Sequence, residues 1–184
     1  MSKASFALQK AALDLALDRG SRVLDLGCGC GIVAIMLALQ RPDWRVTGLE
    51  IQDHLVEMAH RNSDECGTQI DWLCNDLKAY AAEEPFDLIV ANPPWQKPGS
   101  GLLSPHQSKS ISRVELLCSL ADVLGCVWRN LSPNGTALLL YPSERSEDIR
   151  RGAEKSLLDI ISLLPATGLQ NHVVCHVRHK GTFA

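Results

Sequence analysis

The 184-residue sequence has no long hydrophobic run, no excess of positive charge and no C-x-x-C pair among its seven cysteines. Its longest uncharged apolar stretch, near Ile32 to Leu39, is far too short to cross a bilayer, so we expect no membrane association. An odd number of scattered cysteines argues against a disulfide framework and a zinc site, and we expect no metal. Because Lys10, Asp14 and Asp18 interrupt the first segment, it does not predict a secretory signal. The expected compartment is a reducing cytoplasm.

The charge balance is slightly acidic, with 18 Lys and Arg against 21 Asp and Glu. A protein that grips long stretches of nucleic acid is usually more basic, so any contact with nucleic acid is expected to be local. The length suits one domain with a sizeable core, and no repeat or linker interrupts it, so we predict a single domain over residues 1–184. The oligomeric state stays open between monomer and homodimer.

Strand-like and helix-like segments alternate along the chain. Strands are predicted at Arg22–Leu26, Trp44–Glu50, Thr68–Cys74, Phe86–Ala91, Thr136–Tyr141, Leu158–Leu164 and His172–Arg178. Helices are predicted at about 5–19, 32–40, 53–65, 112–130 and 144–157. This order predicts an α/β fold: a doubly wound, Rossmann-like, mostly parallel seven-stranded sheet with an antiparallel last strand.

The most informative stretch is Asn92-Pro93-Pro94-Trp95, directly after the predicted strand Phe86–Ala91. The prolines stop the strand and hold the residues before them extended, which leaves the Asn92 amide and the Pro93 carbonyl unpaired at a carboxyl end of the sheet. Two oxygens beside an indole face suit a flat ring that carries an NH2 group. The alternative is a stiff turn with a surface tryptophan.

A second candidate site follows the first predicted strand, where Gly27-Cys28-Gly29-Cys30-Gly31 leads into an apolar helix. Glycines let the backbone approach a ligand closely, and Glu50, one βαβ step later, can accept both hydroxyls of a ribose. A carboxylate there also disfavours the 2′-phosphate of NADP. The alternative is a tight turn that packs helix on sheet and binds nothing.

Three acidic residues at successive strand ends, Asp25, Glu50 and Asp76, suit a cationic ligand with an adenosine better than a diphosphate. S-adenosylmethionine is such a ligand, since it carries an ammonium and a sulfonium but no pyrophosphate. Asn75 and Asp76 are candidates for the adenine edge. A polar strand-to-helix turn explains that pair equally well.

These motifs resemble those of a known family. The stretch from Val23 to Gly31 resembles motif I of class I S-adenosylmethionine-dependent methyltransferases, and Asn92–Trp95 resembles the N-P-P-aromatic motif of their amino-group branch. The stretches 48–52, 92–101 and 177–181 are similar to the bacterial tRNA(Val) adenine-37 N6-methyltransferase family. Those enzymes usually begin with an extra segment before the first helix, and because the helix is predicted to start at about Ser5, we expect that segment to be missing here.

The resemblance implies methylation of the exocyclic N6 of adenine in RNA, with tRNA as the partner. It implies donor binding by Asp25, Gly27, Cys28, Gly29, Gly31, Glu50, Ile51, Asn75, Asp76 and Asn92. It also implies a catalytic set of Asn92, Pro93, Pro94 and Trp95, with Trp95 in contact with the substrate base. Lys97, Lys109 and Arg113 flank the motif without a matching cluster of acids and are candidates for phosphate contacts, with an ordinary solvated loop as the alternative. Alternatives are methylation of a glutamine amide in release factors, methylation of guanine N2 in ribosomal RNA, and a cofactor-binding subunit that is inactive alone.

Overall fold

The structure is a computed structural model, and it describes residues 2–93 and 118–181. Its strands are β1 (Arg22–Leu26), β2 (Arg45–Glu50), β3 (Asp71–Cys74), β4 (Phe86–Ala91), β5 (Leu131–Pro142), β6 (Leu158–Pro165) and β7 (His172–His179). Its α-helices over these residues are α1 (Lys3–Leu13), α2 (Ile32–Gln40), α3 (Asp53–Glu65), α5 (Leu120–Asn130) and α6 (Ser146–Lys155), with a 3-10 turn at Ser143–Arg145. None of these helices is long and apolar enough to span a membrane.

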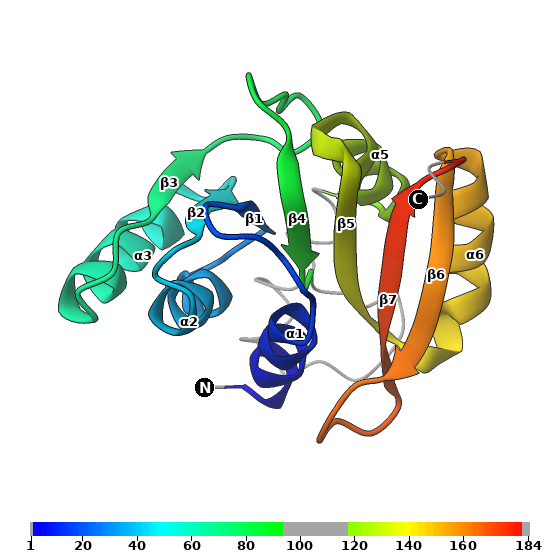
Figure 1. The fold of residues 1–184 in the computed structure, drawn as a ribbon, viewed down its shortest axis with the longest axis horizontal. Coiled ribbons are helices and arrows are strands. Elements are labelled where there is room, and N and C mark those ends of the chain that lie inside the picture. Colours follow the sequence, from blue (N-terminus) through cyan, green and yellow to red (C-terminus); the bar gives the residue numbers. More distant parts are fainter. Residues whose placement is uncertain (1, 94–117, 182–184) are drawn as a thin grey trace, which may run out of the picture.

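The strands form one sheet in the order β3-β2-β1-β4-β5-β7-β6 (Figure 1). The first five strands pair in parallel, and β7 runs antiparallel to both of its neighbours. The order reverses at β1, where the chain moves outward to β2 and β3 before it returns to β4. This is the arrangement that places ligand sites at the carboxyl ends of the strands. The predicted fold class, including the antiparallel last strand, is confirmed.

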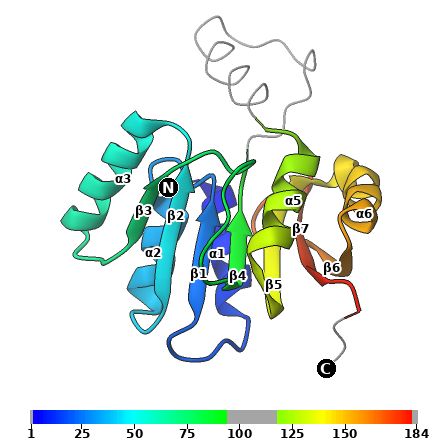
Figure 2. The ribbon, with the colours of Figure 1, turned by 90° about the horizontal axis from the view of Figure 1, so that it is seen from above.

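Two hydrophobic layers cover the sheet, one on each face. In β4, Leu88 and Val90 pack toward α1, α2 and α3, whereas Ile89 and Ala91 pack toward α5 and α6. All four side chains are fully buried, as expected of a parallel strand covered on both faces. Figure 2 shows α3 and β3 at one end of the sheet and α6 and β6 at the other. The central strands therefore form a rigid base for their carboxyl ends.

The first helix is shorter than predicted. It begins after Ser2, whose hydroxyl accepts the Ser5 amide, and it ends at Leu13 rather than near residue 19. The next residues leave the helix because Leu15 and Leu17 pack against the core in an irregular segment. The guanidinium of Arg41 donates to the Leu17 carbonyl and fixes this segment. The helix boundary near residue 19 was therefore wrong.

The helix before β5 also begins later than the predicted residue 112. Residues 112–117 lie outside the described residues, but Cys118 and Ser119 are not helical, and α5 starts at Leu120. Ser119 and Asp122 form a reciprocal capping box, in which each side chain accepts the other residue's backbone amide. The S-x-x-D pattern was a start signal that the sequence analysis overlooked.

Trp72 of β3 packs between the glycine-rich loop and β2. A Cβ atom on Gly31 would lie 2.4 Å from its ring, and one on Gly48 would lie 2.3 Å from it. The indole nitrogen donates to Ser63 Oγ at 3.1 Å, which fixes the ring against α3. Gly31 and Gly48 are thus needed for packing, because any side chain at either position would displace the indole.

We expect Gly48→Ala to destabilise the protein by about 1–3 kcal/mol, because the added methyl group would overlap the Trp72 ring. The matched control is Gly125→Ala in α5, where the new Cβ would meet only an Arg129 side-chain nitrogen at 3.8 Å. Alanine is the better helix former, so that variant should be neutral or slightly more stable. Urea denaturation would measure both, and equal stabilities of the two variants would contradict the packing role of Trp72.

Candidate functional site

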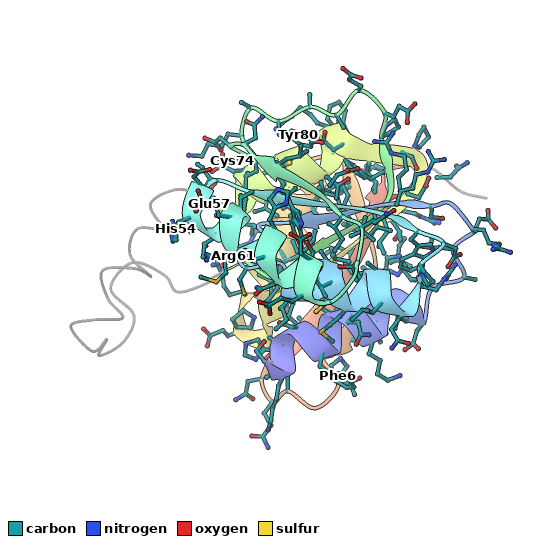
Figure 3. All side chains as sticks on the ribbon, turned by 90° about the vertical axis from the view of Figure 1, so that its left-hand side faces the viewer. Phe6, His54, Glu57, Arg61, Cys74 and Tyr80 are labelled. Atoms are coloured by element: carbon teal, nitrogen blue, oxygen red, sulfur yellow. The ribbon has the colours of Figure 1, made fainter. Side chains whose placement is uncertain are left out.

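A pocket opens at the carboxyl edge of the sheet, where β1, β2, β3 and β4 end next to the start of α5. The residues lining it are Leu26, Gly27, Leu49, Glu50, Ile51, Gln52, Asn75, Asp76, Leu77, Pro93, Cys118 and Val123. Figure 3 views the molecule from the side of α3 and β3, and it labels Cys74 at the end of β3 and His54 and Glu57 in the first turns of α3. The lining is mostly apolar, and its carboxylates belong to Glu50 and Asp76.

Two backbone hydrogen bonds attach the glycine-rich loop to β2. The amides of Gly27 and Cys28 both donate to the Leu49 carbonyl, at 2.8 and 3.0 Å. Gly27 and Gly29 have φ values of +72° and +56°, and a Cβ atom on either would meet no described atom within 4 Å. These two glycines therefore border open space, in contrast to Gly31, which packs on Trp72.

The carboxylate of Glu50 joins the two loops that border the pocket. Its Oε1 accepts hydrogen bonds from the amides of Ile51 and Gln52, both at 3.0 Å, and from the Gln52 side chain at 3.3 Å. Its Oε2 accepts the Gly29 amide at 3.0 Å. Among the described residues Oε2 accepts this one hydrogen bond, so it can accept another. A ligand hydroxyl is a suitable donor for it.

Asp25 lies behind the pocket rather than in it. The side chain is buried, and its Oδ2 accepts the Ala34 amide in the first turn of α2 at 3.1 Å. The N-cap of α2 is Gly31, which has no side chain to offer, so Asp25 satisfies this amide in its place. Burial, with a smaller contribution from the charge of Glu50, raises the pKa of Asp25 to about 7 against the opposing effect of the Ala34 hydrogen bond.

The structure brings together half of the predicted donor-binding residues: Gly27, Glu50, Ile51, Asn75 and Asp76 line the pocket. The other predicted donor-binding residues, among them Asn92, do not line it. Cys28 is buried against β2, with its sulfur 3.1 Å from the place of a Cβ on Gly48, and Gly29 contributes its amide to Glu50.

On the acceptor side, the chain leaves β4 through Asn92, which is half-buried, and Pro93, which is buried and lines the pocket. Asn92 and the pocket residue Pro93 thus follow the same strand end. The predicted site residues Pro94, Trp95, Lys97, Lys109 and Arg113 lie outside the described residues.

The sequence analysis missed several lining residues. Leu77 directly follows the Asn75-Asp76 pair and Gln52 follows Glu50 by two positions, so a search for apolar or polar neighbours of those acids would have found both. Val123 and Cys118 come from the segment around the start of α5. Their position depends on how α5 packs on the sheet, and no local pattern in the sequence reports it.

A parallel sheet whose order reverses beside a glycine loop and a strand-end acid defines a nucleotide-binding α/β domain. Comparison with known proteins gives the family. The protein family described as "Methyltransferase small domain" matches residues 6–104 of this chain. The chain belongs to this methyltransferase family, as predicted.

Among curated relatives, a tRNA1(Val) (adenine(37)-N6)-methyltransferase from Porphyromonas gingivalis is 35% identical over 134 residues, which are 69% of this chain and 52% of the relative. A release factor glutamine methyltransferase from Shewanella oneidensis is 30% identical over 151 residues, 78% of this chain and 52% of the relative. The chain thus spans about half the length of these two relatives.

Among solved structures, a glycopeptide N-methyltransferase complexed with S-adenosyl-L-methionine superposes with a TM-score of 0.72 at 15% identity, covering 97% of this chain and 95% of the other. A putative RNA methyltransferase from Pyrococcus horikoshii gives 0.71 at 16% identity, covering 98% and 84%. Both support the fold of a Rossmann-like methyltransferase. The predicted cofactor, S-adenosylmethionine, is the methyl donor of this class of protein.

We expect Asp25→Asn to flatten the pH dependence of the free energy of unfolding between about pH 4 and 7. In that range the unfolded chain has lost the Asp25 proton, which the folded protein keeps until about pH 7, so rising pH favours unfolding of the wild type. The contribution is on the order of a few kcal/mol. Asparagine still accepts the Ala34 amide but does not ionise.

Urea denaturation from pH 4.5 to 7.5 would measure this effect. The control is Asp43→Asn: the hydrogen bond from Arg41 lowers the pKa of Asp43, so stability from this group is lost only as pH falls below about 4, and the variant should keep the wild-type slope over the measured range. Equal pH slopes for the wild type and Asp25→Asn would show that Asp25 ionises normally in the fold.

Proposed function

We propose that this chain transfers a methyl group from S-adenosylmethionine to the exocyclic N6 of adenine in RNA, with tRNA as the substrate. The observation that carries the proposal is that β4 leads through Asn92 directly into Pro93, which lines the pocket bordered by Gly27 and Glu50. A planar amine held at Asn92 would lie beside a donor held in that pocket. The similarity to the Porphyromonas gingivalis enzyme supports adenine as the acceptor.

The residues of the pocket fit the donor. Open space above Gly27 and Gly29 admits the amino acid part, and the free acceptor position on Glu50 Oε2 suits a ribose hydroxyl. Ile51 and Leu77 offer apolar surface to a flat ring. Asp76 Oδ1 accepts the Lys78 amide at 2.9 Å, and Oδ2, which has no hydrogen bond to the described residues, suits the amino group of adenine. When bound, the donor supplies a methyl group on a sulfonium, which is already a good leaving group.

The acceptor nitrogen needs positioning more than a strong base. Its lone pair is delocalised into the adenine ring, which makes it a poor nucleophile. The Asn92 side-chain oxygen and the Pro93 carbonyl would accept its two hydrogens and turn the lone pair toward the methyl group. Its proton becomes acidic only as the new bond forms. Trp95 would hold the base by stacking, which contributes about 1–3 kcal/mol.

An adenine in a duplex cannot reach this position, so the target is an unstacked base in a single-stranded loop. The net charge of −3 is compatible with a small number of local contacts to such a loop. Lys97, Lys109 and Arg113 are our candidates for phosphate contacts there. We propose the cytoplasm as the place of action, with either a monomer or a homodimer as the active form.

A second candidate acceptor is the side-chain amide of a protein glutamine. The similarity to the Shewanella oneidensis release factor enzyme supports it, and an amide NH2 fits the same pair of oxygens as the adenine amine. Product analysis separates the acceptors. After incubation with labelled S-adenosylmethionine and bulk tRNA, a nucleoside digest analysed by mass spectrometry should contain N6-methyladenosine. A parallel incubation contains release factor in place of tRNA. Label in N2-methylguanosine, label in release factor only, or binding without transfer would contradict the proposal.

We expect Asn92→Ala to reduce methyl transfer to tRNA by a factor on the order of 10²–10³, because one of the two oxygens that orient the amine is lost. Binding of S-adenosylhomocysteine, measured by calorimetry, should change little. Asn134→Ala, at an exposed position in β5, serves as the control and should keep full activity. Near-normal transfer by Asn92→Ala would exclude the proposed role of Asn92.

A further inference from the structure

The connection between β3 and β4 contains no helix among residues 75–85, all of which are described. Its first residues, Asn75, Asp76 and Leu77, form one wall of the pocket. Irregular backbone carries unpaired carbonyls that need donors from elsewhere if the segment is to hold one conformation. Within the segment, the amides of Ala79 and Tyr80 both donate to the Asp76 carbonyl, which forms a single turn.

Donors for the carbonyls of Leu77, Lys78 and Tyr80 come from the last two residues of α5. The guanidinium of Arg129 donates to the carbonyls of Leu77 at 2.8 Å, Lys78 at 3.0 Å and Tyr80 at 3.3 Å. Figure 3 shows where Tyr80 lies in this connection, above β3. One exposed side chain thus binds three carbonyls of the connection, beginning at the wall residue Leu77, and the forked shape of the guanidinium makes this possible.

Asn130 adds a second, buried attachment. Its Oδ1 accepts the Ala82 amide at 2.7 Å, and its Nδ2 donates to the Tyr80 carbonyl at 3.2 Å and to the Cys126 carbonyl within α5 at 2.8 Å. The side chain is only 1% exposed, so these hydrogen bonds are sheltered from water. The connection is therefore attached to α5 at an exposed residue, Arg129, and at a buried residue, Asn130.

The same helix also reaches the pocket directly. Val123 lines the pocket seven residues before Asn130, which places both on one face of α5 about two turns apart. One end of this face borders the ligand space, and the other end holds the connection that carries Asp76 and Leu77. The helix and the wall are thereby fixed relative to each other.

We propose that Arg129 and Asn130 are positioning residues for the adenine of the methyl donor. They hold the connection so that Leu77 lies against the ring and the Asp76 carboxylate meets its amino group. The inference rests on the proposed function, which places adenine at this wall. Neither residue lines the pocket, so both act through Asp76 and Leu77.

The test compares ligands that share or lack the adenine amino group. Calorimetry with the full chain would measure the affinities for S-adenosylhomocysteine, for adenosine and for S-inosylhomocysteine, in which a carbonyl replaces that amino group. We expect Arg129→Ala to weaken the binding of S-adenosylhomocysteine and of adenosine by a similar factor, about tenfold. We also expect it to reduce the preference of the protein for S-adenosylhomocysteine over S-inosylhomocysteine. Arg129→Lys should retain part of that preference, since an ammonium can still donate to one or two of the carbonyls.

Two control variants separate positioning from general damage. Arg151→Ala removes an exposed arginine of α6 whose ion pairs to the described residues are with acids of its own helix, and it should leave all three affinities unchanged. Asn62→Ala removes the hydrogen bond from α3 to the Cys30 carbonyl of the glycine loop. This variant should weaken the binding of S-adenosylhomocysteine but not that of adenosine, because in the proposed site the glycine loop faces the amino acid part of the donor.

The inference is overturned if Arg129→Ala lowers thermal stability but leaves the affinities and the ligand preference as in the wild type. Asn130→Ala should resemble Arg129→Ala if it folds, and the exposed Arg129 keeps the test decisive if it does not. Should the wild type bind neither S-adenosylhomocysteine nor adenosine, the donor site and the inference both fail. If ligand preference shifts as expected but tRNA gains no N6-methyladenosine, the inference stands and the proposed acceptor is wrong.

Discussion

The pocket depends on one buried carboxylate, that of Glu50. This group ends β2 and accepts four hydrogen bonds, one from the glycine loop after β1 and three from the turn that leads into α3. A buried carboxylate without partners would cost several kcal/mol, so the two segments must close around it. Glu50 thus fixes the spacing of the loops that border the donor site, while Oε2 still has room for a ligand hydroxyl. A single side chain serves both the fold and the proposed binding.

The two sides of the pocket are supported from different helices. On the glycine-loop side, α3 holds the Cys30 carbonyl through Asn62 and fixes the Trp72 indole through Ser63. On the opposite side, α5 holds the connection after β3. Because these supports share no residue, the amino acid end and the adenine end of the proposed donor site can be altered independently by substitution. Asn92 and Pro93 follow the end of β4, which is the neighbour of β1 in the sheet.

Much of this could be predicted from the sequence, because β-branched runs followed by polar residues identify strands and their ends. Glu50 was recognised by that logic. The role of Asp25 was not, since its orientation depends on the nearby start of α2, where Gly31 offers no cap. The pattern also could not separate Gly27, which borders open space, from Gly31, which admits Trp72. Both distinctions require contacts between distant parts of the chain, as does the attachment of the pocket wall to Arg129.

The most direct test of the account is a crystal structure of the protein with S-adenosylhomocysteine. We predict that a ribose hydroxyl hydrogen-bonds to Glu50 Oε2, that the adenine lies between Ile51 and Leu77, and that the sulfur faces the end of β4 at Asn92. A nucleoside bound elsewhere, with Gly27 and Gly29 facing only solvent, would contradict the central claim that this carboxyl edge holds the methyl donor.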